Sequence, residues 1–467
     1  MSRAICLALV CGLAAPVLAS PRSDPTSGRA VFTGAATPGA PALELNPAAL
    51  GLGNGATEVY VAALALIDHY SITRDGGPHD DDTEVGPGGV IAWIVPLKDR
   101  AALGVQLHAG PAEVFPAGVA DWQYHTRGGG QRRYGGTVGA SIKLTDELSF
   151  GASLAFENTY LRLRYARDSA LAAAGDPTRG VNSDCGGAPC GIENPLATER
   201  YDVDVSSGWF SASDVLRPNF GLVYEISRGI YLGLSYHMPP GLAVQNALTG
   251  TMRVRQAPRD GGGLVNGRST VYVSQPSSAD AELRARLPDA LDLHVAMRWE
   301  DLSRLQAYDV RGYGPGFTSA NLPEWTERPR GFHDTFAMWA GVEQSEAHTD
   351  ALLRFGGRIG FETAAIAGSR TNPLTIAPAS VTADVGIQLR IAPQLQLQAT
   401  YGLQYFLPVH VGNSAFDPQD QLACMASGYD YSTAACAAVR NGYAIPSAAG
   451  DYDRMQHALR LALRYEY

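Results

Sequence analysis

The feature that most restricts the fold of this chain is a strict alternation of apolar and polar residues over long stretches. In residues 394–405, Leu395 and Leu397 fall on one parity and Gln396 on the other, and residues 454–467 repeat the pattern. Side chains two positions apart lie on the same face of a strand, so each stretch predicts one apolar and one polar face. A soluble β-sandwich also alternates, but its strands average about five or six residues, roughly half the length of these stretches. The length favours strands that cross a membrane.

The same pattern along the chain predicts fourteen strands whose connections alternate between long and tight. Tight connections are expected at 98–99, 145–146, 227–228 and 300–301, near residue 347, and at residue 393. An even strand count with tight turns on one side and long loops on the other is typical of a bacterial outer-membrane barrel, and closure removes the free sheet edge. We therefore predict an all-β, antiparallel transmembrane barrel over residues 57–467. The expected strands are 57–72, 88–97, 100–110, 132–144, 147–165, 209–226, 229–240, 280–299, 302–312, 334–346, 350–362, 379–392, 394–409 and 454–467.

The first nineteen residues resemble a secretory signal peptide. Arg3 precedes an apolar run from Ala4 to Ala15, and small residues before Ser20 suit cleavage there. The run is too short to span a bilayer, which needs about 20 residues. We therefore predict a signal peptide at 1–19 and export from the cytoplasm.

Residues 20–56 do not fit a strand and are predicted to form a plug inside the barrel. The segment is rich in Gly, Ala and Pro and contains the apolar run Leu45-Asn46-Pro47-Ala48-Ala49-Leu50. A flexible periplasmic leader is the alternative interpretation.

Four cysteines remain after the predicted signal peptide, in two pairs that are close in sequence. Exported proteins meet an oxidising compartment, so the pairs Cys185-Cys190 and Cys424-Cys436 predict two disulfides within loops. Zinc is the alternative, but no His lies at ligand spacing beside either pair. The acidic residues at 75–84 suggest a solvated loop, with a Ca²⁺ site as the alternative.

Composition and motifs argue against nucleic-acid binding and against catalysis. The net charge is -10 with a pI near 5.5, so nucleic acid is not an expected partner. Neither a Gly-x-Ser-x-Gly nucleophile motif nor a His-Glu-x-x-His metal motif occurs in the sequence. We therefore expect no enzyme activity, no cofactor and no bound metal.

Several segments, taken in order, resemble the FadL/TodX-type outer-membrane transporters of long-chain fatty acids and other hydrophobic compounds. The segments are Gly34-Ala35-Ala36, Leu45–Leu50, Asn219–Tyr224, Leu232–His237, Leu287-Pro288-Asp289, Phe332–Thr335 and the aromatic C-terminus Leu461–Tyr467. The resemblance implies a fourteen-stranded barrel closed by an N-terminal hatch, with Asn46, Pro47 and Ala48 at the gate. It also implies a lateral exit where the third strand is kinked, here at Gly110-Pro111, because Pro cannot donate to a β-ladder. The alternative for Gly110-Pro111 is the simple end of a strand.

Candidate substrate contacts lie on the predicted inner face of the barrel. Leu64 and Leu66 of the first strand would pack against a ligand or against the plug. An Arg could hold a fatty-acid carboxylate by a bidentate contact, or it could pair with Asp384, Glu466 or the plug. The candidates are Arg354, Arg358, Arg390 and Arg460, with Arg464 on the same face.

The sequence therefore predicts passive transport of a hydrophobic molecule, with a long-chain fatty acid as the leading candidate. A general porin and an uptake channel for aromatic hydrocarbons remain as alternatives. We expect a monomer that crosses the bacterial outer membrane many times and contacts its lipid and lipopolysaccharide.

Overall fold

The computed structural model describes fourteen stretches of the chain. These are residues 31–53, 55–75, 77, 79–97, 100–110, 113–117, 122–169, 196–208, 216–242, 245–287, 290–345, 352–416, 432 and 445–467. The predicted signal peptide, the four cysteines of the predicted disulfides and Pro111 lie outside these residues.

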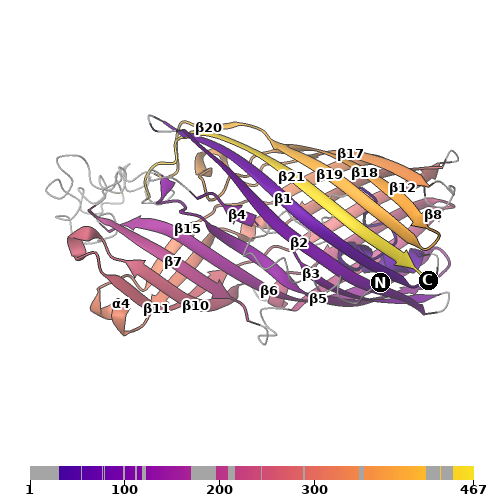
Figure 1. Cartoon of the computed structure of the whole chain (residues 1–467), viewed down its shortest axis with the longest axis horizontal. Helices are drawn as coiled ribbons and strands as arrows, with labels where there is room; N and C mark the ends of the chain where they lie inside the picture. The colour runs from indigo at the N-terminus through magenta and orange to yellow at the C-terminus, as the bar shows by residue number, and fades with distance from the viewer. Residues whose placement is uncertain are drawn as a thin grey trace.

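Fourteen antiparallel strands form a closed barrel (Figure 1). The first and last strands pair along their whole length, with Leu64 opposite Arg460, which closes the sheet. The predicted fold class is therefore confirmed. The barrel strands are β1 (Glu58–Arg74), β2 (His79–Leu97), β3 (Ala101–Ala109), β5 (Gly129–Lys143), β6 (Leu148–Asp168), β8 (Leu216–Ser227), β9 (Ile230–His237), β12 (Ser278–Leu287), β13 (Leu291–Glu300), β16 (Thr335–Gln344), β17 (Leu353–Glu362), β18 (Ser380–Ala392), β19 (Leu395–Phe406) and β21 (Gly450–Glu466).

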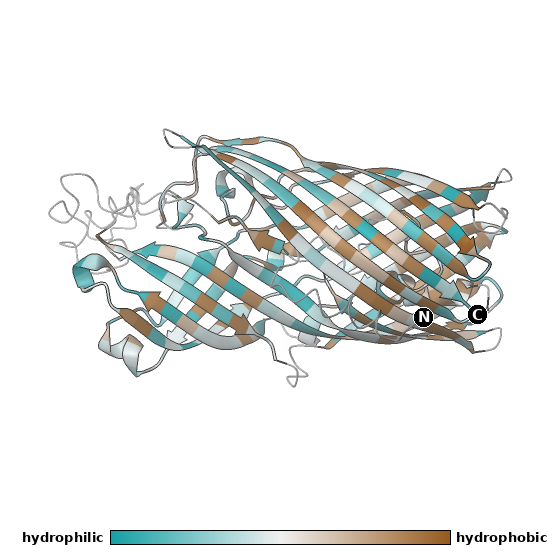
Figure 2. Cartoon of the chain, in the orientation of Figure 1, coloured by the Kyte–Doolittle hydropathy of each residue, from teal (hydrophilic) through white to brown (hydrophobic). Residues whose placement is uncertain are grey.

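The apolar stripe of each barrel strand faces outward, as the alternation predicted. In β21, Leu459, Leu461 and Leu463 are 44%, 54% and 45% exposed, whereas Arg460 between them is 4% exposed. Figure 2 shows these apolar bands on the outer wall of the barrel. An exposed apolar belt on a closed barrel is the surface of a membrane-spanning protein of the outer-membrane type. Among the residues placed in the structure, none belongs to a helix that is both long and apolar enough to cross a membrane.

Two of the predicted strands were wrong, although the total was right. The stretch 280–299 is two barrel strands, β12 and β13, which reverse direction between the paired residues Leu287 and Leu291. This reversal preserves parity, so Leu283 and Val295 both face outward and the alternation runs through the turn. The tight turn predicted at 300–301 is therefore wrong, since β13 ends there at the other rim. The predicted strand 302–312 contributes β14 (Ala307–Tyr313), which is not a barrel strand.

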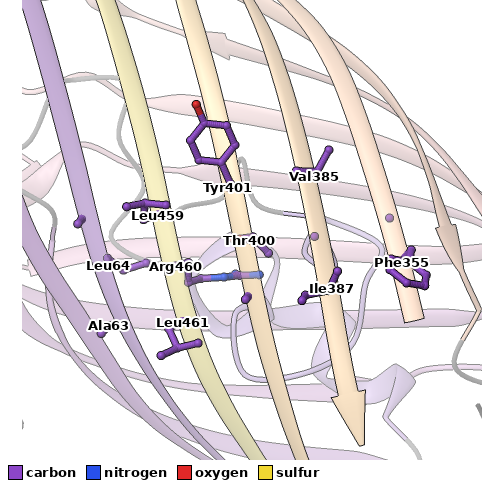
Figure 3. Close-up of a pocket in the computed structure, with 14 residues that line it drawn as sticks. Ala63, Leu64, Phe355, Val385, Ile387, Thr400, Tyr401, Leu459, Arg460 and Leu461 are labelled. Carbon is purple, nitrogen blue, oxygen red and sulfur yellow. The ribbon is translucent and has the colours of Figure 1, made fainter. Parts of the chain in front are cut away.

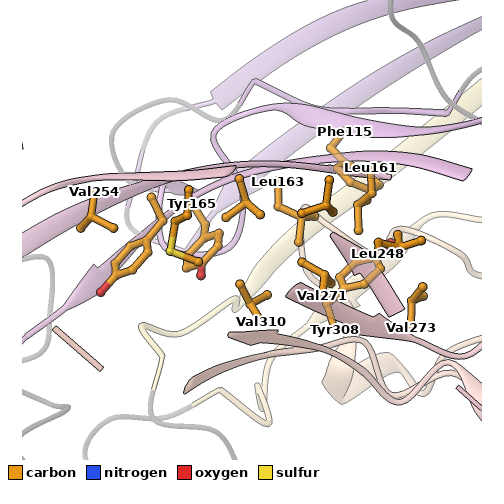
Figure 4. Packing of buried hydrophobic residues seen from close by; sticks show 14 of the residues in the cluster. Phe115, Leu161, Leu163, Tyr165, Leu248, Val254, Val271, Val273, Tyr308 and Val310 are labelled. Carbon is orange, nitrogen blue, oxygen red and sulfur yellow. The ribbon is translucent and has the colours of Figure 1, made fainter. Parts of the chain in front are cut away.

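An additional sheet rises from β6 at the rim opposite the chain termini (Figure 1). Its strands are β7 (Thr198–Ser206), β10 (Asn246–Arg255), β11 (Leu264–Val273), β14 and β15 (Trp325–Pro329), and all of these except β14 lie in stretches predicted to be loops. One face of this outer sheet is buried and apolar, with Leu161, Val203 and Val271 fully covered. Figure 4 shows side chains of this cluster facing one another.

Short elements complete the fold. The helices are α2 (Ala42–Leu45), η1 (Pro47–Leu52), η3 (Pro240–Leu242), η4 (Pro258–Asp260), η5 (Leu302–Arg304), α4 (Pro315–Ser319) and η7 (Gly368–Arg370), and the remaining strands are β4 (Glu113–Phe115) and β20 (Val409–Val411).

Candidate functional site

The N-terminal segment, residues 31–53, lies against inward-facing residues of the barrel wall. Residues 31–36 and 42–50 are buried. The segment contains no strand and is too short to bury these residues by itself, so the barrel wall covers them. Asn46 organises the segment, because its Nδ2 donates to the carbonyl oxygens of Ala35 at 2.6 Å and Leu222 at 3.2 Å. Its Oδ1 accepts from the backbone N–H of Ala48 at 3.1 Å and so caps η1, with Pro47 at the first helical position. The predicted gate residues thus form the joint between the segment and β8.

Glycines in the wall leave room for this segment. A Cβ added at Gly151 would overlap Pro47 and Ala48, and one at Gly221 would overlap the Asn46 side chain. A Cβ at Gly233 would overlap the backbone of Ala35 in the same way. Any other residue at these positions would push the segment away from the wall.

Carboxylates of the wall hold backbone N–H groups of the segment. Glu343 accepts from Phe32 at 2.6 Å and Glu282 accepts from Ala36 at 3.1 Å. The imidazole of His294 lies between these carboxylates, at 2.7 Å from Glu282 and 3.5 Å from Glu343. These three residues were not predicted from the sequence, although each falls on the polar parity of its strand.

Three of the four arginines proposed as substrate contacts lie at the segment instead of facing open space. Arg358 donates to the Thr33 carbonyl oxygen at 3.3 Å, and Arg460 donates to that of Val31 at 2.9 Å. Arg354 donates to Gln388 at 2.9 Å, and its guanidinium lies 5.3 Å from the centre of the Phe32 ring. These contacts fit the alternative in which the arginines hold the plug.

The remaining predicted residues of the inner face are dispersed. Leu64 and Leu66 point into the lumen and are 5% and 6% exposed. Arg390 lies opposite Gln396 near the end of β18, away from Leu64 and Leu66 on β1.

An apolar hollow lies on the lipid side of the wall. It measures about 710 Å³ and is lined by small residues such as Ala63 and Ala399, with Phe355, Tyr401 and Leu459 around them. Figure 3 shows Phe355, Tyr401 and Leu459 on neighbouring strands of the wall. Because Phe355 and Leu459 are exposed, this groove opens to the membrane and is not a luminal binding pocket.

The connection between β17 and β18 packs against inward-facing residues at the outer rim of the barrel. Residues 371–377 of this connection are all buried, and Arg454 of β21 donates to the carbonyl oxygen of Ile376 at 2.9 Å. The same guanidinium lies 2.8 Å from Asp68. A cavity of about 20 Å³ remains beneath, lined by Tyr70, Phe115 and Ile376 among others. This cavity holds about one water molecule, so a larger molecule requires the connection to move.

The wall loosens where β3 ends. The ladder between β2 and β3 stops at Gly89 and Ala109, and His79–Gly88 pair with β1 alone among the residues that the structure places. Gly110 still donates to the Arg133 carbonyl oxygen at 2.8 Å. Beyond it, β4 continues along β5 with the register shifted by one residue and leaves β2. We call the region between the free edge of β2 and β4 the seam.

No group of His, Cys, Asp and Glu residues able to hold a metal ion occurs within the part of the chain that the structure covers. The acidic residues predicted to form a loop at 80–84 lie in β2 instead, beside the seam.

Comparison with known proteins finds likeness in structure but not in sequence. No family profile and no curated protein matches the chain. A FadL homologue of Pseudomonas aeruginosa is 15% identical, with a TM-score of 0.71 over 97% of this chain and 99% of that one. The toluene transporters TodX of Pseudomonas putida and TbuX of Ralstonia pickettii are 12% and 15% identical, with TM-scores of 0.63 and 0.59. Each covers 92% of this chain and 94% of its own. The chain therefore has the fold of the FadL-type transporters.

Proposed function

We propose that this chain is a passive channel of the bacterial outer membrane that admits small hydrophobic molecules, with long-chain fatty acids as the leading candidates. The observation that carries the proposal is the N-terminal segment, which is buried against inward-facing residues of the wall and is held there by Glu282, Glu343 and Arg460. Such a barrel does not suit free diffusion of polar solutes. The likeness in fold to a FadL homologue and to toluene transporters supports the same class of function.

Capture would begin at the outer sheet and the connection between β17 and β18. The apolar side chains of this region are packed together, with Phe115 and Leu374 joining the core of the outer sheet. A hydrophobic molecule that displaces Leu374 would replace the apolar contacts of this side chain with apolar contacts of its own. Each methylene that it buries contributes about 0.8 kcal/mol, so a long alkyl chain could stabilise the open arrangement.

Passage would require the hatch, the N-terminal segment 31–53, to shift. The Asn46-Pro47-Ala48 joint fixes the hatch to β8 through one side chain, so breaking few hydrogen bonds frees it there. The seam would give the substrate an exit through the wall, because His79 to Gly88 of β2 pair with β1 alone among the residues that the structure places. Val85, which faces outward at this edge, is 51% exposed, so the exit opens toward lipid.

Aromatic hydrocarbons are the second candidate substrates. Two of the similar structures are toluene transporters, and the apolar surroundings of the outer cavity suit a ring as well as a chain. Arg454 lines this cavity and pairs with Asp68, so its guanidinium is not reserved for a carboxylate.

Uptake of labelled oleate and labelled toluene by cells lacking other channels of this kind tests the proposal. We expect cells that make the protein to take up oleate faster than cells that do not. Faster uptake of toluene alone would indicate that the substrate is an aromatic hydrocarbon and not a fatty acid. Equal uptake of both compounds with and without the protein would contradict the proposal. In a planar bilayer we expect no steady ion current, whereas a steady current would indicate a porin.

A further inference from the structure

The outer sheet carries a cluster of arginines on its exposed face. Arg200 of β7 and Arg253 and Arg255 of β10 are exposed, and Arg127 and Asp202 lie beside them around a hollow of about 240 Å³. We call these four arginines the arginine patch. The transport path does not use them, because the buried face of the same strands points the other way.

The register places two of these arginines directly opposite each other. Arg255 pairs across the strands with Arg200, whereas Arg253 pairs with the oppositely charged Asp202. Like charges facing each other across an antiparallel pair destabilise it. Within the stretches that the structure describes, Arg200, Arg253 and Arg255 form no ion pair, while Asp202 is 3.7 Å from Arg127 and 3.9 Å from Arg164. The patch therefore has a surplus of cations over the nearby carboxylates.

The height of the patch above the membrane follows from β6, which runs from the lipid belt into the outer sheet. Phe150 and Phe156 face outward and are 39% and 44% exposed, and Arg164 lies on the same parity further along the strand. At roughly 3.3 Å per residue and a tilt near 45°, Arg164 is about 20 Å beyond Phe156 along the membrane normal. Asp202 lies opposite Arg164 in the ladder, so the patch is level with it.

We propose that the arginine patch binds the phosphate groups of the outer-leaflet lipid headgroups, namely lipopolysaccharide. A phosphorylated sugar headgroup reaches above the acyl chains to the height of the patch and supplies the anions that Arg200 and Arg255 lack. Arginine binds phosphate through two parallel hydrogen bonds, so the exposed guanidinium groups suit this partner better than a diffuse counterion. Bound phosphate would also relieve the repulsion between the facing arginines.

Binding of purified full-length protein to lipopolysaccharide, with the R200Q/R253Q/R255Q variant, tests the proposal. A basic residue near an anionic lipid surface contributes about fivefold, so the triple variant should bind about a hundredfold more weakly. R311Q is the matched control, because Arg311 lies exposed on β14 of the same sheet and pairs with Asp309 at 2.8 Å. We expect R311Q to bind like the natural protein and the triple Arg→Lys variant to retain part of the affinity.

Two further binding experiments identify the anion. Enzymatically dephosphorylated lipopolysaccharide should bind as weakly as the triple variant, and inorganic phosphate should fail to displace the intact lipid. Unchanged binding by the triple variant, or equal binding of the dephosphorylated lipid, would overturn the proposal. Displacement by inorganic phosphate would overturn the assignment to a lipid headgroup. The heat-dependent gel mobility of each variant shows that its barrel is folded. Oleate uptake by the triple variant is measured separately, so that a loss of lipopolysaccharide binding can be told apart from a loss of the proposed transport.

Discussion

The joint between the hatch and the wall gives the sharpest prediction. Replacing Asn46 with Ala removes the hydrogen bonds to Ala35, Leu222 and Ala48 at a side chain that is fully buried. Only the hydrogen bond to Leu222 joins the hatch to the wall, because Ala35 and Ala48 belong to the hatch itself. A hydrogen bond contributes about 1 kcal/mol net, so the hatch loses about 1 kcal/mol of attachment and the population of the displaced hatch should rise about fivefold.

Single-channel recording in a planar bilayer measures this change. We expect the N46A barrel to open about fivefold more of the time than the natural barrel, because a displaced hatch admits ions. N266A is the matched control, since Asn266 is exposed on β11 and lies far from the hatch in the ladder. If N46A stays as silent as N266A, the Asn46 joint does not hold the barrel shut.

Three further predictions address the wall, the cysteines and the loop at residues 122–128 around His125, which we call the outer cap. G221A should displace Asn46 and increase protease cleavage near residue 46, whereas G368A, with open space around its Cβ position, should leave the digestion pattern unchanged. Burial, and then Arg328, lower the pKa of His125 to about 3, and its Nε2 lies 2.8 Å from the Pro446 carbonyl oxygen. This histidine is neutral when folded, so the outer cap should be stable above about pH 6.5 and lose stability as the pH falls toward 3. Limited proteolysis at pH 7 and pH 4 should show this loss in the natural protein and less of it in H125Q, and an equal loss in both would exclude His125. Mass spectrometry of the chain purified from outer membranes should place its first residue near Ser20. Reduction should add the mass of about four hydrogen atoms, as expected for two disulfides; a full-length chain or free thiols would refute the respective prediction.

The barrel strands could be predicted because a membrane-spanning strand must place one parity in lipid along its whole length. Residues 394–405 and 454–467 therefore stood out, and both are strands. The same signal failed at 280–299, because the reversal between Leu287 and Leu291 keeps the parity of the outward residues.

The outer sheet was missed because its strands lie inside stretches long enough to be read as loops. The apolar parity of Tyr201, Val203 and Val205 in β7 was a usable signal, since each of the three is buried in the outer core. Its pairing with β6 and β10 depends on tertiary contacts that local alternation does not specify.

The contacts that hold the hatch were beyond local reasoning for a different reason. Phe32 and Glu343, which share a hydrogen bond, are separated by 311 positions. Only closure of the sheet brings them together, so the sequence could offer Arg358 and Arg460 as inward cations but could not choose between substrate and hatch as their partner.

The central claim is that hydrophobic molecules pass when the hatch leaves the wall, and a reversible crosslink tests it most directly. A Cβ added at Gly51 of the hatch would lie 3.8 Å from the Cβ of Ser141 on β5, a separation that suits a disulfide, so a G51C/S141C disulfide should fix the hatch in place. We expect oleate uptake to stop in oxidised cells that make this variant and to return on reduction, while the natural protein, treated alike, transports in both states. Equal uptake by the oxidised and reduced variant, with the crosslink verified by mass spectrometry, would contradict the account.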